Sequence, residues 1–179
     1  LITPALMVSV GCFFYSAELT SLINHGATDS ATEFSILMLC FTAVSTTYIF
    51  GTLLTANGNL RQLNSMALIG IFINLILNFV LIPHFQAFGS AISSLITQFF
   101  TAGIQIYFAV KIFKFKVNTK LLMSLVLFLI GIIAFNFLSK FISGNWMLNF
   151  VIASGSGLAW AFISGLINIK SILRFVKYK

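Results

Sequence analysis

Acidic residues are nearly absent from this sequence, which has only three Asp or Glu among 179 residues, together with two histidines and two cysteines. Enzymes need acid, base or metal-ligating groups gathered at one place, and this supply forms no such constellation. Cys12 and Cys40 both fall inside apolar runs, where we interpret them as packing residues. We therefore expect no catalytic residue, no metal site and no cofactor.

Charge of either sign is also scarce, since only 7% of the residues are charged while 59% are hydrophobic. Soluble domains have roughly 25% charged residues, so this composition lies outside the globular range. The net charge of +7 would suggest nucleic acid in a soluble protein. Here the basic residues lie between apolar stretches, which indicates orientation in a membrane. We expect membrane lipids as partners and no nucleic acid.

Long apolar runs are what the sequence has in abundance. A span needs about 20 apolar residues, and such a stretch can be placed six times. None of these stretches alternates polar and apolar residues with period two, which argues against a transmembrane barrel. We predict an all-α, polytopic transmembrane helical bundle with spans at residues 2–24, 34–56, 64–82, 87–110, 120–139 and 146–168.

The basic residues are divided unevenly between the loops that join these spans. One alternate set of loops and ends holds nine of the ten, and the other set holds only Lys140. Cytoplasmic loops are enriched in Lys and Arg, so both chain ends are predicted to be cytoplasmic. The nine residues are Arg61, Lys111, Lys114, Lys116, Lys120, Lys170, Arg174, Lys177 and Lys179.

Polar residues recur at helical spacing inside three of the spans. Residues three, four and seven positions apart share a helix face. We interpret the hydroxyls as contacts between helices. For the bulkier Asn and Gln side chains two interpretations stay open, packing between helices and a hydrated cavity. The stripes are Ser35, Thr42, Ser45 and Thr52 with Tyr48 nearby; Ala67, Gly70, Asn74 and Asn78; and Ser94, Gln98, Thr101 and Gln105. The candidate cavity residues are Asn74, Asn78, Gln98, Gln105, Tyr48 and Ser94.

Glu18 is the one acidic residue inside a predicted span. Carboxylates within a membrane are candidates for proton or cation sites. Glu18 lies near the outer end of its span, however, where its side chain can reach the interface. Both interpretations stay open, and the interface is the favoured one.

Several short segments resemble one known family. They are Leu53–Gly58, Asn74–Asn78, Leu81–Pro83 and Phe88–Ile92, with Ser16–Leu19 and Asp29–Ala31 upstream. These resemble the C-terminal half of O-antigen and related lipid-linked oligosaccharide flippases, which belong to the multidrug/oligosaccharidyl-lipid/polysaccharide exporter superfamily. The resemblance covers roughly residues 10–112. Gln86 stands where a glycine is common in that family, and Ser90 stands where an alanine is.

The resemblance implies one lobe of a two-lobed transporter that works by alternating access in the bacterial inner membrane. Its cargo would be an undecaprenyl-pyrophosphate-linked sugar repeat unit, moved from the cytoplasmic to the periplasmic leaflet. The chain begins without an initiator methionine, and we expect a fragment that lacks the N-terminal lobe. Other proteins of O-antigen assembly would be further partners. A basic central cavity, if present, would take its charge from the missing lobe.

Two other functions stay open at this point. One is an ion-coupled multidrug and toxin extrusion antiporter, which would require deeply buried carboxylates where this chain offers only Glu18. The other is an integral membrane enzyme of polysaccharide assembly, which would require a catalytic constellation. The shortage of buried carboxylates and of catalytic groups favours the flippase over both.

Overall fold

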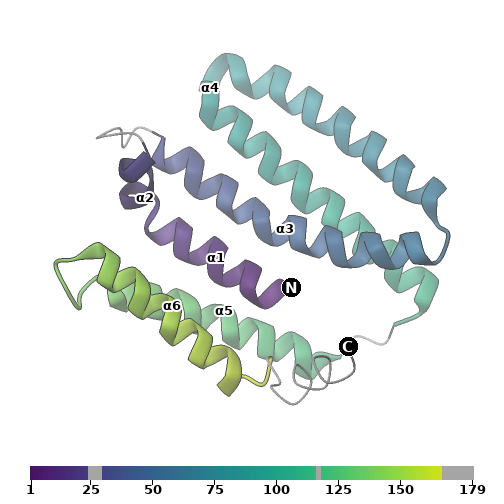
Figure 1. The fold of residues 1–179 in the computed structure, drawn as a ribbon. Helices are drawn as coiled ribbons and strands as arrows, with labels where there is room; N and C mark the ends of the chain where they lie inside the picture. Colours follow the sequence, from purple (N-terminus) through teal and green to yellow (C-terminus); the bar gives the residue numbers. More distant parts are fainter. Residues whose placement is uncertain (24–29, 116–117, 167–179) are drawn as a thin grey trace. The chain divides into compact units, whose positions relative to one another are not determined.

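The computed structural model describes residues 1–23, 30–115 and 118–166, and this part of the chain is helical without any strand. Four of its helices are long and apolar enough to cross a membrane, or five if a bent pair is counted as one span. The predicted all-α fold is confirmed, and the chain is a multi-pass membrane protein. The helices are α1 (Ile2–Phe14), α2 (Ser16–Ile23), α3 (Ala31–Ala56), α4 (Leu60–Phe113), α5 (Thr119–Ser139) and α6 (Trp146–Ile163) (Figure 1).

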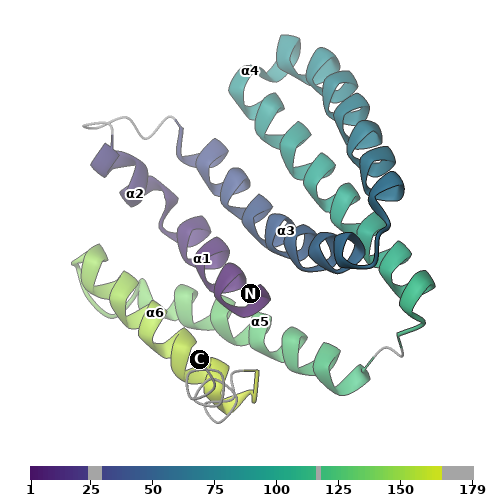
Figure 2. The same cartoon turned by 45° about the vertical axis from the view of Figure 1, so that its right-hand side comes forward.

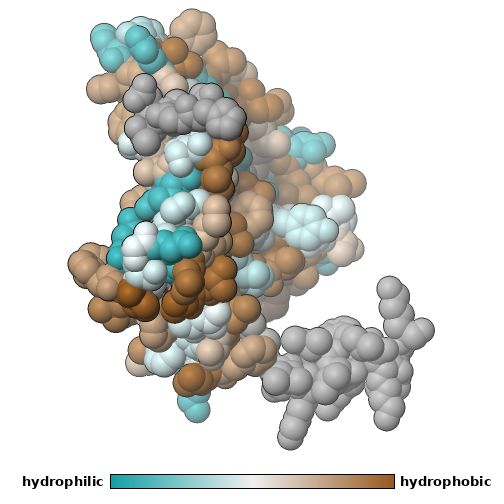
Figure 3. Space-filling view, turned by 60° about the vertical axis from the view of Figure 1, so that its left-hand side comes forward, coloured by the Kyte–Doolittle hydropathy of each residue, from teal (hydrophilic) through white to brown (hydrophobic). Residues whose placement is uncertain are grey.

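The surface of these helices is largely apolar. Phe79, Met123 and Val151 are each about 70% exposed, and brown, apolar residues cover much of the face shown in Figure 3. Large side chains exposed in such numbers suit contact with lipid tails. The chain forms two compact units, Leu1–Lys116 and Val117–Lys179.

In the first unit, α3 lies between α1 and α4 (Figures 1 and 2). The Ser9 hydroxyl of α1 donates to the Met38 carbonyl over 2.8 Å and shares a 2.9 Å hydrogen bond with the Thr42 hydroxyl. Hydroxyls bonded in this way join helices without leaving a polar group unpaired in lipid. The stripe that begins at Ser35 thus includes at least one residue used for packing.

The stretch predicted as a span at residues 2–24 contains two helices in the structure. Helix α1 ends at Phe14 and α2 begins at Ser16, and the two are bent by 79°. Tyr15 between them has a non-helical backbone (φ −111°, ψ 25°), and its side chain is almost fully buried. The bend therefore coincides with a large side chain held in the core, and no proline or glycine marks it. Residue 24 lies outside the described residues.

Helix α4 is a hairpin of two arms, residues 60–85 and 87–113, which lie side by side in Figures 1 and 2. The chain reverses at Gln86, whose backbone is non-helical (φ 48°, ψ −126°). Near the turn, a Cβ atom at Gly89 would overlap the Leu81 carbonyl, so glycine is what permits the arms to meet there. Each arm is longer than the 20 or so residues that cross a bilayer.

The arms match the predicted spans 64–82 and 87–110, with one difference at the turn. The predicted spans leave residues 83–86 as a short loop between the arms. Instead, Pro83 and His84 remain helical and the break comes at Gln86. Proline removes one backbone donor and crowds the carbonyl four residues earlier, and the arm continues for only two residues beyond Pro83 before the break at Gln86.

In the second unit, α5 and α6 pack against each other as an antiparallel pair. The Trp160 indole donates from Nε1 to the Leu127 carbonyl over 3.3 Å, and it covers Gly131 so closely that a Cβ atom there would overlap it. Helix α5 covers the predicted span 120–139, and α6 covers the predicted span 146–168 as far as Ile163. Helix α6 ends at Ile163, because Gly165 takes a left-handed conformation (φ 70°) that stops it. Residues 167 and 168 lie outside the described residues.

Candidate functional site

The two polar stripes of α4 converge on one groove of about 650 Å³ between the arms, which we call the polar groove. The first arm brings Asn74 and Asn78, and the second brings Ser94 and Gln98. These are four of the six residues predicted as cavity candidates. The other lining residues are Ala67, Gly70, Ile71, Leu75, Phe79, Thr97 and Thr101.

A chain of hydrogen bonds crosses the polar groove. Asn78 donates from Nδ2 to the Oδ1 atom of Asn74 over 2.9 Å, and Asn74 donates from Nδ2 to the Thr97 hydroxyl over 3.3 Å. Thr97 in turn donates to the Ser93 carbonyl over 2.7 Å. The chain is directional, and its far end is the buried Asn78 Oδ1 atom, which has no partner among the described residues. A buried amide oxygen without a partner costs on the order of 1–3 kcal/mol, so Asn78 is held in the groove wall at some cost to stability.

Small residues set the width of the groove. A Cβ atom at Gly70 would lie 3.1 Å from the Thr101 hydroxyl oxygen, so the arms approach closely at this depth. Thr101 donates to the Thr97 carbonyl over 2.8 Å, which uses its proton and leaves its lone pairs available. Ser94 and Gln98 form no hydrogen bond with the described residues, so their donors and acceptors remain for a ligand. Thr97 was not predicted, although it lies three positions after Ser94 and four before Thr101 and therefore shares their helix face.

The polar groove is electrically neutral, since none of its lining residues is Lys, Arg, Asp or Glu. Amides and hydroxyls offer both donors and acceptors without exchanging protons near neutral pH. Such a surface can bind a neutral ligand that carries hydroxyl groups. It holds no acid, base or nucleophile pair for catalysis.

Two predicted cavity residues lie away from the polar groove. Gln105 is only 6% exposed and packs against α3, where a Cβ atom at Gly51 would lie 3.4 Å from its Oε1 atom. This Oε1 atom has no partner among the described residues. Tyr48 is 64% exposed on α3 and does not line the groove. For Gln105 the geometry favours packing between helices.

Glu18 lies in the first turn of α2, directly after the bend at Tyr15. It is half-buried, and it is not among the residues of the polar groove. A carboxylate is favourable at the start of a helix because it faces the positive end of the helix dipole. Within the described ranges, no group of three or more His, Cys, Asp or Glu residues could hold a metal ion.

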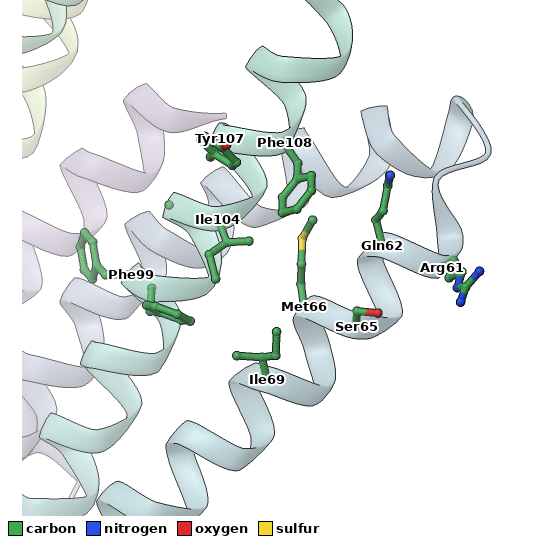
Figure 4. Close-up of a pocket in the computed structure, with 11 residues that line it drawn as sticks. Arg61, Gln62, Ser65, Met66, Ile69, Phe99, Ile104, Tyr107 and Phe108 are labelled. Carbon is green, nitrogen blue, oxygen red and sulfur yellow. The ribbon is translucent and has the colours of Figure 1, made fainter.

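A second and larger crevice, of about 840 Å³, lies between the arms near Arg61, at the end of the hairpin opposite the turn (Figure 4). Sequence reasoning treated Arg61 only as a topology signal and did not predict this feature. The lining residues are Arg61, Gln62, Ser65, Met66, Ile69, Phe99, Phe100, Gly103, Ile104, Tyr107 and Phe108.

The crevice also bears on the charge pattern. Lys111 holds its Nζ atom 6.0 Å from the centre of the Tyr107 ring, and Tyr107 lines the same crevice as Arg61. The hairpin thus gathers two of the predicted cytoplasmic cations at one end. Lys116 and the basic tail with Lys170, Arg174, Lys177 and Lys179 lie outside the described residues.

The hairpin of α4 therefore carries two separate hollows: a neutral polar groove with amides from both arms, and an apolar crevice with Arg61 at its end. No residue lines both of them. Comparisons of the chain with protein families, with curated proteins and with solved structures found no match.

Proposed function

We propose that this chain is the C-terminal lobe of a flippase for undecaprenyl-pyrophosphate-linked O-antigen or related oligosaccharide repeat units. The observation that carries the proposal is the convergence of Asn74, Asn78, Ser94 and Gln98 on one neutral groove inside a membrane hairpin. Polar groups are costly in hydrocarbon, and their presence at one place indicates a polar ligand or water in the transport path.

The composition of the groove suits a sugar. Sugar hydroxyls both donate and accept hydrogen bonds, and the amides of Asn74, Asn78 and Gln98 do the same. The apolar side chains of Ile71, Leu75 and Phe79 would contact the less polar faces of sugar rings. Weak, exchangeable contacts of this kind fit a carrier, because cargo that must leave again cannot be bound too tightly.

The pyrophosphate of the cargo needs a cation that the polar groove does not have. We assign this charge to the N-terminal lobe. The proposed whole is a two-lobed bundle that works by alternating access, with the polar groove as part of one wall of the central cavity. Further partners would be other proteins of O-antigen assembly.

The proposed setting is the bacterial inner membrane, with both chain ends in the cytoplasm. The bent pair α1–α2, the two arms of α4, and helices α3, α5 and α6 would make six spans. Nine of the ten basic residues would then be cytoplasmic, in keeping with the positive-inside rule.

The polar groove favours a flippase over the ion-coupled extrusion antiporter. A proton or sodium site requires carboxylates deep in the membrane, and the groove has none. Glu18, the candidate ion site, lies outside the groove at the start of α2. An enzyme of polysaccharide assembly would need a catalytic group at the groove, where only amides and hydroxyls are found.

The test is the double substitution Asn74→Leu with Asn78→Leu. It removes the hydrogen-bond chain while keeping the apolar character that membrane insertion requires. We expect loss of O-antigen display on cells that depend on this protein, seen as loss of the ladder on a gel, with an unchanged amount of protein in the membrane fraction.

The matched control is Asn136→Leu in α5, because the Asn136 amide donates only to the Ile132 carbonyl of its own helix. This variant should keep O-antigen display. Normal display in the double variant would contradict a role of the groove in transport. Normal display combined with new sensitivity to drugs would favour the antiporter.

A further inference from the structure

The crevice at the Arg61 end of the hairpin combines a polar end with an apolar length. Its polar lining residues are Arg61, Gln62 and Ser65, all within the first two turns of α4 (Figure 4). The remaining lining, apart from the phenol of Tyr107, is apolar. This distribution matches a molecule with one polar head and a long apolar tail.

The crevice is open to the side of the hairpin. Ile69, Phe99 and Phe100 line it and are each 41–50% exposed. In Figure 4, Met66 and Ile69 of the first arm face Ile104 and Phe108 of the second arm. In a membrane protein an open apolar crevice is reached from the lipid phase, so a tail can enter laterally from the bilayer.

The polar end of the crevice is positively charged. Arg61 lines it, and Lys111 lies close to Tyr107 on the facing arm. No acidic residue lines the crevice to neutralise these cations. Guanidinium groups pair with phosphate oxygens through two parallel hydrogen bonds, which makes Arg61 a suitable partner for a phosphate headgroup.

We propose that this crevice binds an anionic phospholipid of the surrounding bilayer, with the phosphate at Arg61 and one acyl chain between Ile69, Ile104 and Phe108. The predicted orientation places this end at the cytoplasmic leaflet, where anionic lipids attract basic residues. The lipid differs from the proposed cargo, because the crevice shares no residue with the polar groove. The inference stands whether or not the chain is a flippase.

The test counts lipids that remain bound to the purified protein by native mass spectrometry, after addition of phosphatidylglycerol or phosphatidylcholine. We expect phosphatidylglycerol to be retained about fivefold better, which is the effect of one basic residue at a membrane surface. Arg61→Gln should remove this preference, and Arg61→Lys should retain part of it. The control Lys120→Gln removes an equal charge at the start of α5 and should leave the preference unchanged.

A second variant tests the acyl-chain part of the site. Gly103 lines the crevice with open space around its Cβ position, so Gly103→Leu fills the crevice without a clash. It should lower retention of both lipids at this site. The control Gly155→Leu places the same side chain into open space on α6 and should have no effect.

Three outcomes would overturn the proposal. They are equal retention of the two lipids by the unchanged protein, unchanged retention in Gly103→Leu, and displacement of phosphatidylglycerol by millimolar inorganic phosphate. The last result would identify a site for free phosphate. O-antigen display is not a readout of this experiment, so its failure and that of the proposed function are distinguishable.

Discussion

Asparagine has different roles in the two compact units of this chain. In the unit of α5 and α6, Asn118 and Asn145 accept hydrogen bonds from backbone N–H groups at the helix starts, and Asn136 and Asn149 donate to nearby carbonyls. In the hairpin of α4, the Asn74 amide bonds to side chains on both arms. The Asn74 amide thus joins the two arms of the hairpin, whereas the Asn136 amide bonds only within its own helix.

The oxygens of these amides sharpen the contrast. Asn78, Asn136 and Asn149 each have a buried Oδ1 atom without a partner among the described residues. Of these three residues only Asn78 lines the polar groove, together with Ser94 and Gln98. The three unpaired oxygens therefore differ only in that Asn78 is one of the residues that line the polar groove.

The largest expected effect is in the α5–α6 pair. Gly131→Leu would force a side chain into the Trp160 indole, and such overpacking costs about 3 kcal/mol. Thermal unfolding in detergent, followed by tryptophan fluorescence, measures the loss, because both tryptophans of the chain are in α6. Gly155→Leu is the control, since its Cβ position is open. Equal stability of the two variants would contradict the idea that this unit is held by close helix packing.

An intermediate effect is expected for cysteines placed at two glutamines of one stripe. In a background with Cys12 and Cys40 replaced by alanine, Gln98→Cys should react with a water-soluble maleimide about tenfold faster than Gln105→Cys, because thiol reactivity follows exposure. The rate of labelling in membrane vesicles is the measurement. Similar rates at both positions would mean that water reaches the α3–α4 contact as well as the polar groove.

The smallest effect concerns the turn of the hairpin. The two non-glycine residues of the described ranges with positive φ, Gln86 and Lys114, both lie at the turn or end of α4. Gln86→Gly should stabilise the protein by about 1 kcal/mol, because its backbone angles (φ 48°, ψ −126°) are readily available only to glycine. Gln86→Ala retains the Cβ atom and should bring no gain in the midpoint of thermal unfolding. A gain from alanine as large as that from glycine would contradict this explanation.

Much of the fold could be predicted from the sequence, because membrane helices are recognised by the length of their apolar segments and by the polar residues that separate these segments. Four residues of the α4 stripes, Asn74, Asn78, Ser94 and Gln98, line the same groove. The place of Gln105 could not be predicted in this way, since a stripe gives the face of a helix and not the neighbour in front of it. The bend at Tyr15 carries no proline or glycine signal, and it depends on tertiary packing.

The apolar crevice was missed for a related reason. Phe99, Ile104 and Phe108 are the kind of residue that faces lipid, and nothing in one helix indicates that the other arm leaves a space beside them. Arg61 had a sufficient explanation as a topology signal. Hollows between helices depend on the register of two arms, which the sequence of either arm does not contain.

The tight turn of α4 has a consequence for how the protein is made. Residues 83–87 contain two polar side chains, His84 and Gln86, and no formally charged Lys, Arg, Asp or Glu. Only this short segment has to cross the hydrocarbon when the arms enter the membrane as a pair. We therefore expect translocation of the turn to meet a low barrier, because the segment carries few polar side chains. A charged loop added at Gln86 would act on biogenesis before it acted on transport.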